Sequence, residues 1–119
     1  MTQAAVRVAV AGARGKMGTT AIAALEQAHG VEYIGGLVRS RADSAKHEYG
    51  DIEDLLVSAR PDVLVDFTHF PDSKRIALAC IRAAVRPVIG TSGYGADDIA
   101  ELRARTPRGA RRCRRRRSP

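Results

Sequence analysis

The chain has 119 residues, the size of one ordinary domain, and 20 Lys and Arg residues against 13 Asp and Glu residues give it a net charge of +7. No apolar run approaches the roughly 20 residues of a transmembrane helix, and no charged segment followed by an apolar one marks a secretory signal. With two cysteines, Cys80 and Cys113, at no metal-ligand spacing, we expect a cytoplasmic protein without membrane partner, disulfide framework or metal site.

The first predicted element is a buried strand over residues 6–11, which ends at three glycines spaced three residues apart, Gly12, Gly15 and Gly18. A helix-forming segment follows them. In a βα turn that binds a dinucleotide pyrophosphate, such glycines permit a tight turn, close approach of a phosphate and close helix packing. The alternative is an ordinary structural turn. Arg14 and Lys16 would add positive potential beside the phosphates.

Helical spacing then predicts a helix over residues 16–29, with Met17, Ala21, Leu25 and Ala28 on one face. A second strand follows over residues 31–38.

The second strand leads directly into Arg39. In dinucleotide-binding folds an acid near this point binds the ribose 2′-hydroxyl, whereas an arginine favours a 2′-phosphate. The residues therefore favour NADPH over NADH, with NADH still possible. The alternative is that Arg39 is a solvated loop cation.

Residues 39–50 are polar and predicted to be irregular. Asp51 is a candidate N-cap for a short helix through residue 58, with Leu55 and Leu56 as its buried contacts. A third strand is predicted over residues 63–67.

Chemistry-bearing side chains follow the third strand. We expect Asp66 to accept backbone N–H groups of the following turn, and His69 to be a solvated loop histidine. Phe67 and Thr68 are candidates to line a nicotinamide pocket.

The next helix is predicted to begin with Asp72 or Ser73 as cap, and Ile76, Cys80 and Ala83 line one face of it. Residues 86–89 are predicted as a fourth strand, which enters a turn over residues 90–93. Thr91 and Ser92 there offer hydroxyls and amides, or form a simple turn. Asp97 and Asp98 lie favourably in the first turn of a last helix.

Strands that alternate with helices predict an α/β fold, a Rossmann-like parallel sheet with helices on both faces. Ligands of such sheets bind at the carboxyl ends of the strands. Three polar or glycine-rich turns lie at that edge, over residues 12–18, 68–71 and 90–93.

After residue 103 the periodic pattern stops. Residues 103–119 hold nine arginines and no acid, so the rest of the chain, with 11 basic and 13 acidic residues, is mildly acidic. We expect a domain over residues 1–103 and a disordered Arg-rich tail over residues 104–119. A shifted reading frame in a GC-rich gene produces this composition, so we expect out-of-frame sequence. The alternative is a functional nucleic-acid-binding arm.

Three motifs in series resemble the N-terminal domain of dihydrodipicolinate reductase (4-hydroxy-tetrahydrodipicolinate reductase), a lysine-biosynthesis enzyme of the diaminopimelate route. They occupy residues 8–18, 65–68 and 88–93. The resemblance implies that the pyrophosphate is held by Gly12, Ala13, Arg14, Gly15, Lys16 and Met17. It also implies that Arg39 lies by the adenosine ribose, and Gly90, Thr91 and Ser92 by the nicotinamide end.

The resemblance also implies a second domain, with a His-His-x-x-Lys motif that binds a dicarboxylate substrate and donates a proton, and with the tetramer interface. Nothing in this chain matches that motif. We therefore assign no catalytic residue and expect a truncated cofactor-binding half that is inactive alone. The alternatives are a stand-alone nucleotide-binding module and a nucleic-acid binder that uses the arginine tail.

Overall fold

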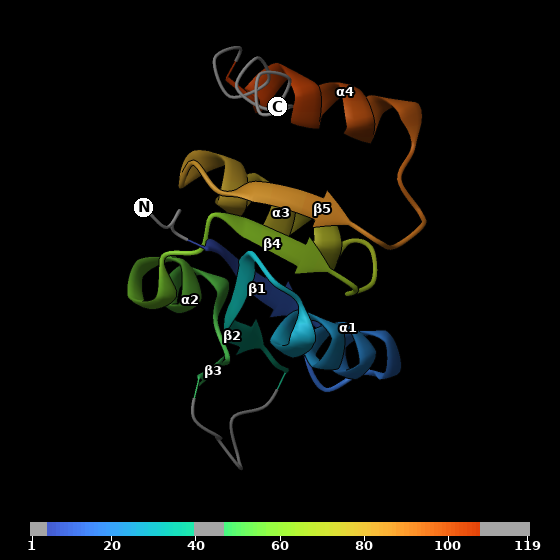
Figure 1. Ribbon diagram of the computed structural model, residues 1–119. Coiled ribbons are helices and arrows are strands. Elements are labelled where there is room, and N and C mark those ends of the chain that lie inside the picture. Colours follow the sequence, from blue (N-terminus) through green and yellow to red (C-terminus); the bar gives the residue numbers. More distant parts are fainter. Residues whose placement is uncertain (1–4, 40–46, 108–119) are drawn as a thin grey trace.

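The computed structural model describes residues 5–39 and 47–107. In these residues five parallel strands form one sheet in the order β3-β2-β1-β4-β5 (Figure 1). The elements in chain order are β1 (Val6–Ala11), α1 (Lys16–Gln27), β2 (Val31–Leu37), β3 (Glu48–Tyr49), α2 (Ile52–Ala59), β4 (Val63–Asp66), α3 (Asp72–Arg82), β5 (Arg86–Ile89) and α4 (Ala96–Arg105). The predicted Rossmann-like α/β fold is confirmed.

The core lies between the sheet and the helices α2 and α3. Leu55 of α2, Leu64 of β4, and Ile76 and Cys80 of α3 belong to one buried cluster, and each is at most 1% exposed. Ala9 of the central strand β1 belongs to the same cluster. Since side chains alternate along a strand, the neighbouring buried valines of β1 face the other side, where α1 packs against β1 and β2.

Strand β3 was not predicted, because it falls within the segment 39–50 that we expected to be irregular. Its two residues pair in parallel with β2, with Glu48 beside Gly36 and Tyr49 beside Leu37. A strand of two residues is too short for a period-2 pattern, so its sequence carries no signal.

Two predicted helix faces are correct only in part, since Ala21 and Leu25 of α1 are half-buried and Ile76 and Cys80 of α3 are buried, but the other predicted residues are exposed. Ala28 is exposed because α1 ends at Gln27. Met17 is 58% exposed, and the one buried residue of α1 is Gly18, which lies against the preceding turn. Ala83 is also exposed, because it is the C-cap of α3 and lies outside the helix.

The sequence predicts N-cap residues for α2 and for α3, and only the prediction for α2 is confirmed. Asp51 caps α2 as predicted, since its side chain accepts a hydrogen bond from the Asp54 N–H at 3.2 Å. The N-cap of α3 is instead Pro71, and neither Asp72 nor Ser73 takes that place. Ser73 is fully buried, because its hydroxyl is bonded to the end of β4.

Helix α4 packs against α3 and lies apart from the sheet (Figure 1). It extends to Arg105, so the boundary predicted after residue 103 falls within its last turn. Residues 108–119 of the predicted tail lie outside the described residues. Among the helices of residues 5–39 and 47–107, none is long and apolar enough to cross a membrane.

Candidate nucleotide-binding site

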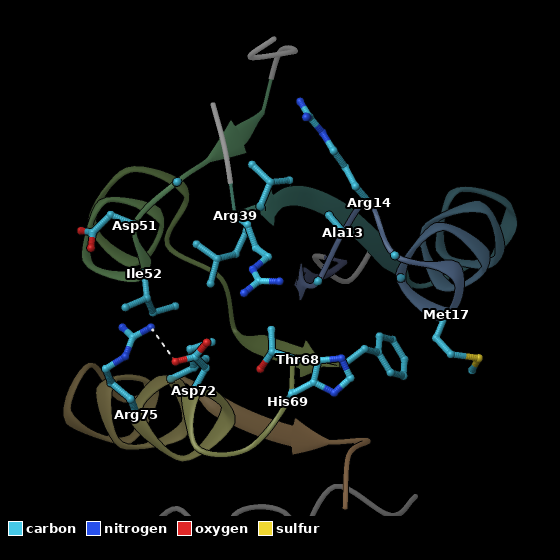
Figure 2. A pocket seen from close by; sticks show the side chains of 18 of the residues that line it. Ala13, Arg14, Met17, Arg39, Asp51, Ile52, Thr68, His69, Asp72 and Arg75 are labelled. Carbon is cyan, nitrogen blue, oxygen red and sulfur yellow. Dashed lines mark ion pairs between the residues drawn. The ribbon is translucent and has the colours of Figure 1, made fainter. Parts of the chain in front are cut away.

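A pocket of about 900 Å³ opens at the carboxyl ends of β1, β2 and β4 (Figure 2). Its walls come from the turn at residues 12–18, the end of β2, the start of α2, the segment after β4 and the first turns of α3. The volume is within the range of ordinary small-molecule sites, roughly 300–1,000 Å³. Its place at the strand ends is where open parallel sheets bind ligands.

The glycine turn forms the wall of the pocket next to α1. Gly12 has a φ of +78°, which favours glycine, and the amides of Gly12 and Ala13 both donate to the Leu37 carbonyl, at 3.1 and 3.2 Å. A Cβ on Gly18 would lie 2.0 Å from the Gly12 carbonyl oxygen, so only glycine permits this contact between helix and turn. The predicted reasons for the first and third glycines therefore match the geometry.

The N-terminus of α1 faces the same pocket. Its N-cap is Gly15, which has no side-chain acceptor, and its first turn holds no acidic residue. Lys16 and Met17 line the pocket beside it. A helix N-terminus with this composition presents backbone N–H groups and positive charge to an anion.

The two arginines near this turn point in different directions. Arg39 extends from the end of β2 into the pocket, between α2 and Thr68 (Figure 2). Arg14 extends away from it, and its guanidinium pairs with Glu48 of β3, with Nη2 2.5 Å from Oε1. Arg14 thus lines the pocket but directs its guanidinium away from it, whereas Arg39 directs its guanidinium into it (Figure 2).

At the end of β4 the buried carboxylate of Asp66 holds the wall of the pocket that follows this strand. It accepts hydrogen bonds from the Thr68 N–H at 2.8 Å, from the Thr68 hydroxyl at 2.6 Å and from the Ser73 hydroxyl. The expected acceptor role of Asp66 is confirmed. Its bonds fix Thr68, which lines the pocket beside Phe67 and the exposed His69.

The turn after β5 lies next to this wall but outside the pocket lining. The Gly90 amide donates to the Asp66 carbonyl at 2.8 Å, and a Cβ on Gly90 would lie 2.9 Å from Cε1 of Phe67. Phe67 thus packs against Gly90, and the predicted site residues Gly90, Thr91 and Ser92 do not line this pocket themselves.

Sequence reasoning did not select several lining residues as site residues. Asp51 and Ile52 begin α2, and Asp72 and Arg75 lie on α3, where they form an ion pair at 3.8 Å (Figure 2). Their position in the chain could have indicated them, because helices that follow parallel strands begin at the same edge of the sheet.

Comparison with known proteins identifies the family. Residues 6–108 match the family model described as "Dihydrodipicolinate reductase, N-terminus". The chain is 32% identical over 116 residues to 4-hydroxy-tetrahydrodipicolinate reductase of Bacillus velezensis, covering 89% of this chain and 43% of the relative. It is 37% identical over 110 residues to the enzyme of the same name from Halalkalibacterium halodurans, with 82% and 41% covered. The chain thus spans less than half the length of these curated relatives.

Solved structures agree with the sequence matches. A dipicolinate-bound dihydrodipicolinate reductase from Paenisporosarcina sp. TG-14 superposes with a TM-score of 0.78 and 25% identity, over 86% of this chain and 43% of that one. Homoserine dehydrogenase of S. aureus, with 14% identity and a TM-score of 0.71 over 86% of this chain and 30% of that one, shares the fold alone. The resemblance inferred from the three motifs is confirmed.

Proposed function

The chain belongs to the dihydrodipicolinate reductase family, and we propose that its pocket binds a nicotinamide dinucleotide, NADPH in preference to NADH. The observation that carries the proposal is the pocket itself, since a glycine turn, an uncapped helix N-terminus and Arg39 line one cavity at the strand ends. The nucleotide-binding domain predicted over residues 1–103 would then continue to Arg105, where α4 ends, and the separate tail would follow it.

The residues present fit the pyrophosphate of such a cofactor. Gly15 lies in the mouth of the turn, where an added Cβ would meet only the Gly12 carbonyl oxygen, at 3.4 Å. The space above it is therefore open to a phosphate. We assign the pyrophosphate to Gly12, Ala13, Arg14, Gly15, Lys16 and Met17, with Arg14 contributing its backbone while Glu48 holds its side chain.

Arg39 supports the preference for the phosphorylated dinucleotide. Val38, the residue before it, is apolar where an acid would bind the ribose 2′-hydroxyl. A guanidinium at this place forms charge-assisted hydrogen bonds with a 2′-phosphate. Arg75 of α3 also lines the cavity, where its charge is paired with that of Asp72 at 3.8 Å.

The opposite end of the site would hold the nicotinamide, which supplies the hydride when the cofactor is bound. We assign this end to Phe67 and Thr68, with Gly90, Thr91 and Ser92 beside them. The Thr68 hydroxyl donates its hydrogen bond to Asp66, so this hydroxyl can only accept a hydrogen bond from a ligand. In this role the chain binds and orients the hydride donor and excludes water from one face of it.

The complete reaction is proposed from the relatives, which are named as reductases of 4-hydroxy-tetrahydrodipicolinate. Hydride would pass to that cyclic dicarboxylate. Substrate anchors, the proton donor and the tetramer interface would belong to the part of the relatives that this chain does not span. We assign no catalytic residue to the chain, and we expect no turnover from it alone.

Isothermal titration of the chain with NADPH and with NADH tests the proposal. NADPH should bind at least tenfold more tightly, since a hydrogen bond to a charged group contributes about 1.5–3 kcal/mol. Arg39→Ala should remove this difference by weakening NADPH and leaving NADH unchanged. Arg82→Ala is the matched control, because Arg82 is an exposed arginine of α3 that pairs with Glu53 at 3.5 Å.

Two results would contradict the proposal. Absence of heat with both dinucleotides would remove the binding function itself. Equal affinities that Arg39→Ala lowers together would retain the function and remove the assignment of Arg39 to a 2′-phosphate.

A further inference from the structure

A chain of buried and partly buried hydrogen bonds connects the end of β4 with the segment between β5 and α4. Asp66 and Ser73 are 1% and 0% exposed, and the Ser73 hydroxyl is bonded to the Asp66 carboxylate. The same hydroxyl lies 2.7 Å from the Tyr94 phenol oxygen. Three elements far apart in the sequence, β4, α3 and the segment 90–95, therefore share one polar cluster.

The chemistry of the groups sets the direction of these bonds. A carboxylate only accepts, so the Ser73 hydroxyl donates its single proton to Asp66. Ser73 then has only lone pairs left for Tyr94, and Tyr94 must donate to Ser73. Burial raises the pKa of the Tyr94 phenol above its ordinary value, which keeps the donating proton on the oxygen.

The segment 90–94 is held at both of its ends. At its start the Gly90 amide donates to the Asp66 carbonyl at 2.8 Å. At its end the Tyr94 ring packs edge-on against Phe70, with centroids 5.2 Å apart. Gly93, at a φ of +102°, lies so close that an added Cβ would be 3.0 Å from that of Phe70. Thr91 and Ser92 lie between these two attachments.

We infer that Tyr94 is a positioning residue for the nicotinamide end of the site, acting through Ser73 and Asp66. This inference rests on the proposed function, which assigns Gly90, Thr91 and Ser92 to that end. One oxygen of the Asp66 carboxylate accepts from the Thr68 hydroxyl, and the other accepts from the Ser73 hydroxyl, which in turn is bonded to Tyr94. The cluster thus sets the distance between Thr68 and the segment that carries Thr91, the two sides between which a nicotinamide would lie.

Tyr94→Phe tests the inference, because it removes the phenol oxygen and keeps the ring on Phe70. The probes are NADPH and 2′,5′-ADP, which carries the adenosine half and the 2′-phosphate without the nicotinamide. NADPH should bind the variant about three- to tenfold more weakly, as expected for one lost hydrogen bond. The affinity for 2′,5′-ADP should stay within twofold of that of the unaltered chain.

A purely structural role of Tyr94 would not weaken the binding of NADPH while leaving that of 2′,5′-ADP unchanged. Equal weakening of both probes, or no weakening of NADPH, would overturn the inference. If the unaltered chain binds neither probe, the proposed function fails as well, and that result is distinct from either of the others.

Two further variants complete the experiment. Tyr33→Phe is the control, since it removes the oxygen of another partly buried tyrosine, on β2. Ser73→Ala should give the same split as Tyr94→Phe, and combining the two should add little, because both act through one chain of bonds. Additive losses would overturn the connection through Ser73. Should Ser73→Ala fail to fold, Tyr94→Phe alone still decides between the outcomes.

Discussion

Gly15 and Gly18 belong to the same turn, but different constraints require a glycine at each position. A Cβ on Gly18 would meet backbone atoms of Gly12 at 2.0 and 2.8 Å, which cannot move without opening the turn. At Gly15 the φ is −75°, an ordinary value for any residue, and the nearest atom is 3.4 Å away. The protein's fold thus requires Gly18, while the glycine at position 15 is explained by the pyrophosphate that we propose to bind there.

Gly15→Ala should therefore separate folding from binding. We expect a loss of about 0.5–1 kcal/mol of unfolding free energy, because alanine is a poorer N-cap than glycine. We expect a loss of at least tenfold in NADPH affinity, because the new methyl group occupies the approach of the pyrophosphate. Chemical denaturation and titration measure the two effects.

Gly18→Ala serves as the contrast to Gly15→Ala. It should prevent folding, or destabilise the chain by several kcal/mol, since overpacking against backbone cannot relax. A stable Gly15→Ala variant with unchanged NADPH affinity would show that the pyrophosphate does not lie over this turn.

The site residues that were predictable are those whose chemistry is local. The glycine turn and Arg39 follow directly after strands, so their place at the sheet edge is implied by the strand pattern alone. The pairing of Arg14 with Glu48 was not predictable, because it depends on β3. Arg75 was missed for a similar reason, since its direction into the pocket depends on how α3 packs on the sheet.

At the scale of elements, α4 is attached to α3 through a cluster of charges. The Lys74 ammonium lies 2.8 Å from an Asp98 carboxylate oxygen and 2.7 Å from one of Glu101. Hydrogen bonds from Lys74 lower the pKa values of Asp98 and Glu101. The same hydrogen bonds raise the pKa of Lys74. Since α4 has no buried residue, these charges are a principal link between it and the domain.

The pH dependence of this link has a definite sign. Carboxyl groups with lowered folded pKa values stabilise fully above their ordinary values of 3.8 and 4.5, and this contribution disappears as the pH falls through the lowered values. Lys74, with a raised pKa, stabilises fully below its ordinary value of 10.5 and loses its effect as the pH rises beyond. The link should therefore be strongest between about pH 5 and pH 10.

Lys74→Met tests this expectation. The variant should melt a few degrees below the unaltered chain at neutral pH, and the difference should shrink below pH 4. Thermal unfolding followed by circular dichroism at several pH values gives this difference directly. Arg105→Ala is a control, because Arg105 contacts Glu101 only at 3.5 Å and both partners are exposed or half-exposed. A constant difference across the acid range would show that the charges do not hold α4.

Most elements were predictable because their periodicities are long enough to read. The helix over residues 72–82 repeats apolar residues at helical spacing, and its buried Ile76 and Cys80 were predicted. The face of α1 was predicted only in part, because its one fully buried residue is Gly18, while Ala21 and Leu25 are half-buried. In that helix the exposed Met17 lines the pocket, so its side chain belongs to the site and not to the core.

At the scale of the whole molecule, the two faces of the sheet near β4 and β5 are covered unequally. Leu64 and its neighbours on one face contact α3 in the core. Since side chains alternate, Val65 lies on the other face, and Val88, its register partner on β5, lies beside it. Val88 is 49% exposed, and β5 is an edge strand of the described sheet.

An exposed apolar face next to a sheet edge favours association between molecules. Val88→Lys should therefore reduce aggregation of the isolated chain, because a charge on this face opposes the contact, while the α3-side core stays intact. Light scattering during heating, together with sedimentation at increasing protein concentration, measures the effect. Val57→Lys is the matched control: Val57 is 74% exposed on α2, but single apolar residues on a helix surface do not promote association. If both variants suppress aggregation equally, added charge alone accounts for the effect. If only Val88→Lys does so, the open face of β4 and β5 is the surface through which the chain associates.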